Sequence, residues 1–448
     1  MIREMTWNNE INRDVAYTIG KAYGTKLLSI GKNKCIVGYD NRESSIELSL
    51  SLSLGILSTG VDVINLGLVT TPMAIYSKEV LKIPSYVMVT ASHNPKDDNG
   101  FKFSFDESGN VKGDDIDKFY DLVISGNFKE GMGKFSRYNV EKDYLELFRR
   151  GINLGDKKLK VVIDLANGTT SCIARELFEQ FDIDLTIINE ESDSSFPNHH
   201  PDPCVAANQK QLQDKVLELH ADLGIGFDGD GDRCGIVDNL GHIIPTDIYM
   251  AIMCKDIILN NEDKRILYDV KCSNALKDEI VKWGGVPICY RTGASYTMAK
   301  VIDDNILFGG EYSGHLYFRD KDADCASAIY AALRLLEILS KTSEKLSKII
   351  KEFPKYYSTP EIKIPCSDNK KFMIVEEIKK YAKEHNYPFN DIDGVRITYT
   401  NGWALVRASN TGPNLTFRGE ATTEEGVKIL ENIYLPMIQE KQKNIDTL

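Results

Sequence analysis

A serine that could carry a reactive group stands directly after an apolar run. Residues 90–95 read Thr-Ala-Ser-His-Asn-Pro, and residues 86–89 before them read Tyr-Val-Met-Val. The apolar run predicts a buried strand, so the turn that follows should display Ser92 rather than bury it. A displayed hydroxyl beside His93 can act as a nucleophile or phosphoryl carrier. An ordinary turn closed by a serine or threonine hydroxyl is the commoner explanation of such a segment on its own.

A second loop carries three carboxylates. Residues 228–233 read Asp-Gly-Asp-Gly-Asp-Arg and follow the apolar run 223–227. Like charges packed this closely need a cation, and oxygen ligands favour Mg²⁺, Ca²⁺ or Mn²⁺. An EF-hand is excluded, because that motif needs glycine in place of Arg233 and glutamate in place of Asn239. The adjacent arginine suits a metal-bound phosphoryl oxygen, and a solvated acidic turn is the alternative.

Two further loops contain groups that bind sugars and anions. Residues 309–315 read Gly-Gly-Glu-Tyr-Ser-Gly-His, and their carboxylate, hydroxyl and imidazole could hydrogen-bond vicinal sugar hydroxyls. Residues 407–412 read Arg-Ala-Ser-Asn-Thr-Gly, followed by Arg418. Guanidinium groups, hydroxyls and turn N–H groups together favour an anion site. The alternative for the first of these loops is a polar turn with a capping role, and for the second an ordinary turn with two surface arginines.

The elements that must position these loops follow an α/β pattern. Apolar runs at 35–40, 161–164 and 266–269 each lead into a polar turn and the start of a helix. Their spacing of about a hundred residues indicates related α/β domains rather than a solenoid. Residues 46–54 alternate apolar and polar side chains, which is a strand period, but their position after a polar turn predicts a helix.

The last part of the chain has a different pattern. It predicts a helix around 371–384 and strands at 395–399 and 403–407, which is typical of an α+β domain. We therefore expect an α/β protein with three related α/β mixed-sheet domains plus a C-terminal α+β domain around a central cleft. The predicted boundaries are 1–141 (domain 1), 142–245 (domain 2), 246–354 (domain 3) and 355–448 (domain 4).

Bulk composition limits the class of protein. The 448 residues are too many for one core, and no apolar run is long enough to span a membrane. The polar N-terminal segment argues against a secretory signal, and nine scattered cysteines indicate a reduced intracellular protein. A net charge of −12 disfavours nucleic-acid binding. We expect a cytoplasmic monomer or homodimer without nucleic-acid or membrane partners.

Together, and in this order, the four loops resemble those of the α-D-phosphohexomutase family across essentially the whole chain. Residues 90–95 are similar to its phosphoserine loop, 228–233 to its metal loop, 311–315 to its sugar loop and 407–411 to its phosphate-binding loop. Supporting matches lie at 38–42, 99–102, 196–203 and 270–273. The sugar loop, the His-His-Pro-Asp-Pro stretch and Ser409-Asn410-Thr411 look more like the phosphomannomutase/phosphoglucomutase subgroup than phosphoglucosamine mutase.

The resemblance implies an enzyme that interconverts the 1-phosphate and 6-phosphate of mannose, glucose or both, through phospho-Ser92 and a 1,6-bisphosphate. Mg²⁺ would be the cofactor, and glucose 1,6-bisphosphate the primer. The implied catalytic residues are Ser92, His93, Lys102, Arg233 and His315, and the implied metal ligands are Ser92, Asp228, Asp230 and Asp232. The implied substrate-binding residues are Arg42, Glu311, Tyr312, Ser313, Arg407, Ser409, Asn410, Thr411 and Arg418. Lys102 and His315 are the candidate bases, while His93 would assist the phosphoserine or its loop.

The sequence departs from the family pattern in three places. The Asp-Ile-Arg-Gly motif is reduced to Ile2-Arg3 followed by Glu4, Ala294 stands where the family often has histidine, and Gly412 replaces a frequent glutamate. Phosphoglucosamine mutase, a phosphatase or phosphotransferase, and a catalytically inactive sugar-phosphate-binding homologue are the alternatives. The joint presence of the serine, the aspartates and the sugar loop argues against a pure binding protein.

Overall fold

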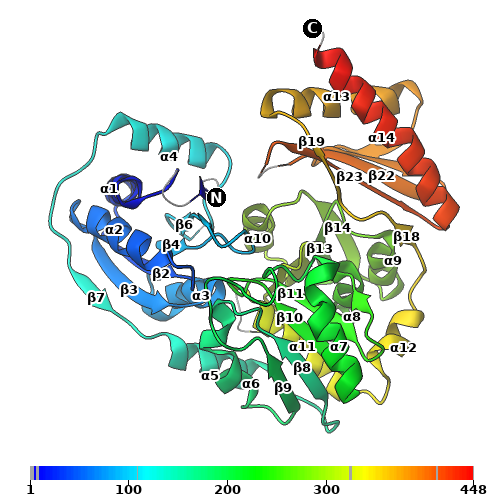
Figure 1. Cartoon of the computed structure of the whole chain (residues 1–448), viewed down its shortest axis with the longest axis horizontal. Coiled ribbons are helices and arrows are strands. Elements are labelled where there is room, and N and C mark those ends of the chain that lie inside the picture. Colours follow the sequence, from blue (N-terminus) through cyan, green and yellow to red (C-terminus); the bar gives the residue numbers. More distant parts are fainter. Residues whose placement is uncertain (1–4, 7–9, 108, 322–324, 410–411, 447–448) are drawn as a thin grey trace.

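A computed structural model describes residues 5–6, 10–107, 109–321, 325–409 and 412–446. Within these residues the chain forms three five-stranded sheets and one six-stranded sheet, arranged as four domains (Figure 1). A short two-stranded sheet joins β1 (Met5–Thr6) to β5 (Asp98–Asn99). No helix in the described part of the chain combines the length and the apolar character that a membrane crossing requires.

The first sheet has the strand order β6-β4-β2-β3-β7. Its strands are β2 (Lys34–Tyr39), β3 (Asp62–Leu68), β4 (Tyr86–Val89), β6 (Phe101–Ser104) and β7 (Phe135–Arg137). The accompanying helices are α1 (Arg13–Ser29), α2 (Ser45–Leu57), α3 (Thr71–Leu81) and α4 (Asp114–Ser125).

The predicted helix after the first strand is confirmed as α2. Leu48, Leu52 and Ile56 are buried at helical spacing. Leu50 and Leu54 are exposed on the opposite face. The alternation in the sequence therefore reflects a helix that is apolar on two faces with serines between them, not a strand.

The second and third sheets have the orders β12-β11-β10-β8-β9 and β14-β13-β15-β16-β17. The second domain comprises α5 (Glu141–Gly151), β8 (Lys160–Asp164), η1 (Thr169–Cys172), α6 (Ala174–Phe178), β9 (Asp184–Ile188), η2 (Ala206–Gln209), α7 (Lys210–Leu219), β10 (Leu223–Phe227), β11 (Cys234–Asp238) and β12 (Ile243–Ile244). The third comprises α8 (Thr246–Asn260), β13 (Arg265–Asp269), α9 (Asn274–Lys282), β14 (Val286–Tyr290), α10 (Ala294–Asp303), β15 (Phe308–Gly310), β16 (Leu316–Phe318), β17 (Cys325–Ala326), α11 (Ala328–Ser340) and α12 (Leu346–Lys351).

These three sheets share one connectivity. In each, the first strand in chain order (β2, β8 or β13) lies between the second and third strands and pairs parallel with both. The third strand then pairs antiparallel with the strand that follows it, which gives the pairs β4–β6, β10–β11 and β15–β16. The three predicted apolar runs are these first strands, so the prediction of related α/β domains is confirmed. The loops of interest connect the third strand to the strand after it in all three sheets.

The fourth domain has an antiparallel sheet of order β18-β23-β22-β21-β20, with β19 also paired to β23. Its elements are β18 (Tyr357–Ser358), β19 (Ile362–Pro365), α13 (Asp368–Glu384), β20 (Phe389–Asn390), β21 (Val395–Tyr399), β22 (Gly402–Ala408), β23 (Asn414–Ala421) and α14 (Glu424–Asp446). Both helices pack on the sheet (Figure 1). The predicted helix and strands are confirmed, and so is the α+β character of this domain.

The apolar core is continuous across the first three domains. One cluster contains Met88 from the first sheet, Phe227 from the second and Phe308 from the third. The fourth domain has its own core, which includes Ile374 of α13 and Val406 of β22. The first three domains therefore form one packed body, while the exact boundaries remain predictions.

Candidate active site

Ser92 follows the end of β4 and faces the second domain. Its hydroxyl Oγ donates to Asp228 Oδ2 at 3.0 Å, and its backbone N–H donates to Thr90 Oγ1 at 2.8 Å. The His93 Nδ1 atom lies 3.3 Å from the same Oγ. Ser92 has a φ of 52° and is only 2% exposed. The expectation that the turn displays this serine rather than burying it is therefore wrong, because the aspartate loop of the second domain packs against it. A left-handed backbone costs a non-glycine residue roughly 1–3 kcal/mol, so surrounding contacts must hold this conformation.

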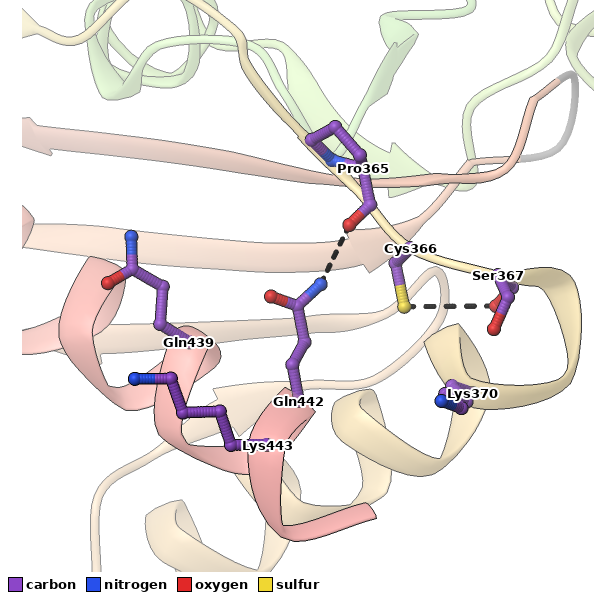
Figure 2. Close-up of a pocket in the computed structure, with 7 residues that line it drawn as sticks. All are labelled: Pro365, Cys366, Ser367, Lys370, Gln439, Gln442 and Lys443. Atoms are coloured by element: carbon purple, nitrogen blue, oxygen red, sulfur yellow. Dashed lines mark hydrogen bonds between the residues drawn. The ribbon is translucent and has the colours of Figure 1, made fainter. Parts of the chain in front are cut away.

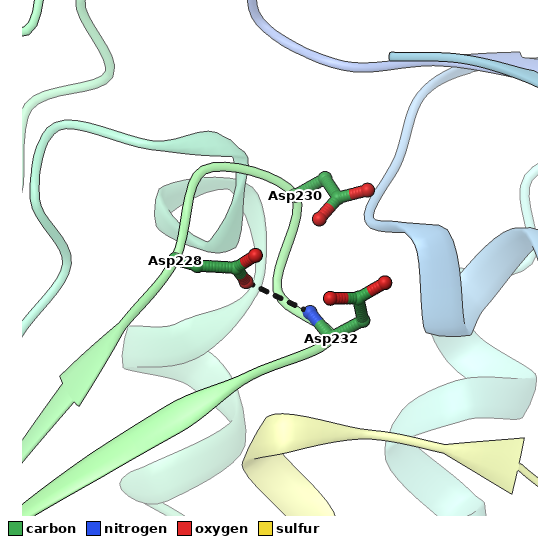
Figure 3. A group of neighbouring side chains, drawn as sticks. All are labelled: Asp228, Asp230 and Asp232. Carbon is green, nitrogen blue, oxygen red and sulfur yellow. Dashed lines mark hydrogen bonds between the residues drawn. The ribbon is translucent and has the colours of Figure 1, made fainter. Parts of the chain in front are cut away.

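The three aspartates of the second-domain loop converge as predicted (Figure 3). One carboxylate oxygen from each lies within 4.8 Å of the others, and all three residues are buried. Asp228 Oδ1 accepts the backbone N–H groups of Gly231, Asp232 and Arg233 at 3.0–3.1 Å. These bonds curl the loop back on its first residue, and Gly231 at a φ of 78° permits the turn.

The charge of this cluster is balanced from the first domain. Lys102 of β6 donates from Nζ to Asp230 Oδ2 at 2.6 Å and to Asp232 Oδ2 at 2.8 Å. Burial alone would lower the pKa of Lys102, but these two carboxylates raise it above its ordinary value, so the side chain is an ammonium ion. Burial and then the charges of Asp232 and Asp230 raise the pKa of Asp228 well above its usual range.

The donor set suits a hard divalent cation. It consists entirely of carboxylate oxygens, with the Ser92 hydroxyl oxygen beside them. Among the described atoms, Asp230 Oδ1 is buried without a hydrogen-bond partner. Asp230 Oδ2 accepts from Thr71 at 2.5 Å and from Thr90 at 3.2 Å, so the carboxylate is oriented with its free oxygen available as a ligand.

The sugar-loop candidate of the third domain contacts the aspartate loop. His315 Nε2 lies 3.1 Å from Asp232 Oδ1 and 3.4 Å from Arg233 Nε. Its other ring nitrogen, Nδ1, lies 3.0 Å from Ser313 Oγ. Glu311 is buried, its pKa is raised by that burial, and its Oε1 accepts the N–H of Gly293 at 2.5 Å. Polar groups of the second and third domains thus form one connected cluster.

The anion-site candidate lies in the hairpin between β22 and β23. Arg407 donates from Nε to Asp393 Oδ2 at 2.9 Å, and the same carboxylate oxygen accepts the N–H of Thr292 from the third domain at 3.0 Å. The predicted residues Asn410 and Thr411 lie outside the described residues. On the helix side of the hairpin, Lys371 Nζ donates to the carbonyl oxygen of Ser409 at 2.6 Å, which fixes the start of the loop.

Two arginines expected to touch substrate are occupied by protein groups here. Arg42 is 2% exposed and donates to main-chain carbonyls of the Ser92 loop. Arg418 is also 2% exposed, donates to the carbonyl of Lys271, and stacks on the Tyr312 ring at 3.6 Å. Substrate contact by either arginine stays a prediction. The observed contacts give them roles in holding loops together.

The cluster around Ser92 therefore contains most of the predicted residues. It joins Ser92, His93, Lys102, Asp228, Asp230, Asp232, Arg233, Glu311, Ser313 and His315. Tyr312, Arg407, Ser409 and Arg418 lie at or near the junction of the third and fourth domains.

Sequence reasoning missed several residues that shape these loops. Thr71 and Thr90 orient Asp230, while Asp393 orients Arg407. The sequence could have identified Lys371 as a buried residue. It lies three positions before Ile374 and seven before Ile378, on the buried face of α13. A lysine on such a face must have a buried partner.

A separate depression lies in the fourth domain between β19 and α14 (Figure 2). It has a volume of about 370 Å³ and is lined by Pro365, Cys366, Ser367, Lys370, Gln439, Gln442 and Lys443. Gln442 donates to the Pro365 carbonyl at 2.8 Å across it. None of its lining residues belongs to the predicted site.

Comparison with known proteins places the chain in a family. Residues 2–130, 142–241 and 245–357 match phosphoglucomutase/phosphomannomutase alpha/beta/alpha domains I, II and III, and residues 361–432 match the C-terminal domain. A phosphomannomutase/phosphoglucomutase of Pseudomonas syringae pv. tomato is 36% identical over 97% of this chain and 93% of its own length. That of Pseudomonas aeruginosa is 37% identical over 95% and 91%.

A solved structure agrees with this assignment. The crystal structure of a phosphoglucomutase/phosphomannomutase family protein from Burkholderia thailandensis superimposes with a TM-score of 0.91 and 31% identity. The match covers 98% of this chain and 96% of that one. The chain therefore belongs to the phosphoglucomutase/phosphomannomutase family.

Proposed function

We propose that this chain is a phosphohexomutase that interconverts hexose 1-phosphate and hexose 6-phosphate through phospho-Ser92. The observation that carries the proposal is the 3.0 Å contact between Ser92 Oγ and Asp228 in the buried aspartate cluster. A serine hydroxyl beside a cation site in an anion-binding environment is the arrangement that phosphoryl transfer requires. The mannose and glucose phosphates named for the relatives are the substrates that we propose here.

In the first half-reaction, a free hydroxyl of the bound hexose phosphate attacks the phosphorus of phospho-Ser92. A new P–O bond forms to the sugar, the bond to Ser92 Oγ breaks, and a 1,6-bisphosphate results. The sugar hydroxyl loses its proton, for which His315 is the candidate acceptor. Lys102, the other base expected from the sequence, is already an ammonium ion held by Asp230 and Asp232 and cannot accept a proton. The proton that Ser92 Oγ regains can come through His93, whose Nδ1 lies 3.3 Å away.

Catalysis of such a transfer consists mostly of stabilising the negative charge on the phosphoryl group. A divalent cation such as Mg²⁺, held by Ser92, Asp228, Asp230 and Asp232, would supply positive charge against the phosphoryl oxygens. Lys102 and Arg233 add fixed positive charge on either side of the aspartates. Thr71 and Thr90 keep Asp230 aligned.

The second half-reaction needs the bisphosphate to turn end for end, so that its other phosphate returns to Ser92. Glu311 and Ser313 could hold sugar hydroxyls in both orientations. Arg407, Ser409 and the loop after them would anchor the phosphate that is not reacting. A trace of glucose 1,6-bisphosphate should prime enzyme molecules that have lost their phosphate.

A coupled assay tests the proposal. The enzyme is given mannose 1-phosphate or glucose 1-phosphate with Mg²⁺ and a trace of glucose 1,6-bisphosphate, and both 6-phosphate and free phosphate are measured. Isomerisation that depends on priming supports a mutase and ranks the two sugars. Free phosphate without isomer would overturn it in favour of a hydrolase. If neither sugar is converted, the remaining alternatives are an enzyme that acts on glucosamine phosphate and a catalytically inactive homologue.

A further inference from the structure

Arg42 makes an unusual set of contacts under the Ser92 loop. Its Nη2 donates to the carbonyl oxygens of Ser92 at 2.9 Å and Asn94 at 2.8 Å. Its Nη1 donates to the carbonyl oxygens of Pro95 and Asp98. Its Nε donates to Asp40 Oδ2 at 3.2 Å. A guanidinium has five N–H groups, so every donor of this side chain has an acceptor in the protein.

The arginine is itself firmly held. Asp40 Oδ1 accepts the backbone N–H of Arg42 at 3.1 Å and the hydroxyl of Ser45 at 2.5 Å. The guanidinium also lies 5.6 Å from the ring centre of Phe196, a residue of the second domain. The Asp40–Arg42 pair, which we call the clamp, therefore fixes the rear of the Ser92 loop and contacts the domain that carries the aspartates.

We infer that Arg42 is a positioning residue, which acts on phosphoryl transfer through the main chain of the Ser92 loop and does not contact the substrate. This inference rests on the proposed function of Ser92 as the phosphoryl carrier. Four carbonyl oxygens drawn toward one buried cation keep the loop turned, with Ser92 at a φ of 52° and its Oγ directed at Asp228. In-line transfer requires placement of the reacting atoms to within about 1 Å, and an error of that size can cost about 100-fold in rate.

Lysine at position 42 would be a partial replacement. An ammonium group has three donors on a flexible stem and cannot reproduce a planar fork that meets four carbonyls and a carboxylate. Asp40→Asn is a milder change, since it keeps the size of the acceptor and removes its charge. If Arg42→Lys fails to fold, Asp40→Asn still tests the clamp.

The test measures, in a single turnover, how the labelled phosphoryl group divides between transfer to the sugar and loss to water. Enzyme labelled on Ser92 with ³²P from glucose 1,6-bisphosphate is mixed with glucose 1-phosphate, and label is counted in the sugar phosphates (bisphosphate plus 6-phosphate) and in inorganic phosphate. Both products start from the same phosphorylated molecules, so their ratio does not depend on the folded fraction. We expect Arg42→Lys to slow transfer by about 10- to 100-fold and to raise the share lost to water. The sugar concentration for half-maximal rate should stay within about twofold of wild type.

A matched control is Arg334→Lys. Arg334 is 1% exposed and donates to Asp320 and Asp256 in the third domain, so its replacement should lower thermal stability without changing the partition. A wild-type rate and partition in labelled Arg42→Lys or Asp40→Asn would overturn the inference. The inference would also be overturned if the variants only raised the sugar concentration needed for half-maximal rate and left the maximal rate unchanged. That result would mean that Arg42 contacts the substrate directly. Failure of the wild-type enzyme to take label at all would instead contradict the function proposed for Ser92.

Discussion

The carbonyl oxygen of Ser92 lies against Gly229, in the space that a side chain at position 229 would need. The same carbonyl accepts a hydrogen bond from Arg42 at 2.9 Å, so it cannot easily move away. The serine loop of the first domain and the aspartate loop of the second are therefore in backbone contact. Glycine at this position permits Ser92 Oγ to reach Asp228.

Gly229→Ala should lower kcat by about 100-fold, because the added Cβ must push the two loops apart. Gly226→Ala is the control on the adjoining strand, where a Cβ would meet Leu212 and Pro203 at 3.5 and 3.7 Å, which is ordinary contact. Both variants are compared by steady-state kinetics and circular dichroism. Equal activity in the two variants would contradict the importance of the contact.

Asp230→Asn should weaken Mg²⁺ binding by about tenfold or more and reduce activity in parallel. The change removes one negative charge from the aspartate cluster. It also alters the carboxylate of Asp230, whose Oδ1 atom is buried without a hydrogen-bond partner among the described residues. Calorimetric titration with Mg²⁺ measures the affinity directly. Asp238→Asn, a buried carboxylate at the end of β11, is the control. An unchanged titration in Asp230→Asn would remove this residue from the ligand set.

Lys371→Met should raise KM for the hexose phosphate by about tenfold, with a smaller effect on kcat. The Nζ atom of Lys371 donates to the carbonyl oxygens of Ser409 and Gly412 at 2.6 and 3.2 Å, so its loss frees both ends of the loop that we propose binds the phosphate. Leaving the carbonyl of the buried Ser409 without this donor should also cost about 1–3 kcal/mol of stability. The control is Lys380→Met, an exposed ion pair on the same helix. A lower stability with an unchanged KM would limit Lys371 to a structural role.

His199 should make the stability of the second domain depend on pH. Burial opposes the charged ring, but the 3.0 Å contact with Asp164 outweighs it and raises the pKa of His199 above 6.5. Because the folded pKa is the higher one, the contribution is complete below pH 6.5 and is lost as the pH rises through the folded value. Urea unfolding of wild type and His199→Gln should differ most at low pH, and the difference should shrink as the pH rises through the folded pKa of His199. A difference independent of pH would show that the ring is not charged in the folded state.

The sequence predicted the loops well because their signals are local. The strands that carry the loops end at Val89, Phe227 and Gly310. Each is followed within a few residues by the polar side chains that identify the loop. Strand and turn depend on residues that are close in the chain. The same runs also predicted three related α/β domains, but the strand order within each sheet came only from the structure.

The long-range contacts that hold the loops in place could not be predicted in the same way. Besides Asp40, the acceptors of Arg42 are four main-chain carbonyls 50 to 56 residues away, which carry no side-chain signal. Asp393 lies in a polar turn that looks like any surface loop until its contacts with Arg407 and Thr292 are known. Long-range hydrogen bonds to backbone groups depend on the assembled fold, whereas the motifs depend on residue type and spacing.

The central claim is that Ser92 carries the phosphoryl group during turnover. The most direct test labels the enzyme with ³²P-glucose 1,6-bisphosphate, maps the label by mass spectrometry, and follows its loss after hexose 1-phosphate is added. We predict one label per chain on Ser92, transferred to the sugar at least as fast as kcat, with neither label nor activity in Ser92→Ala. Turnover near the wild-type rate in Ser92→Ala, or label that persists while substrate is converted, would contradict the account.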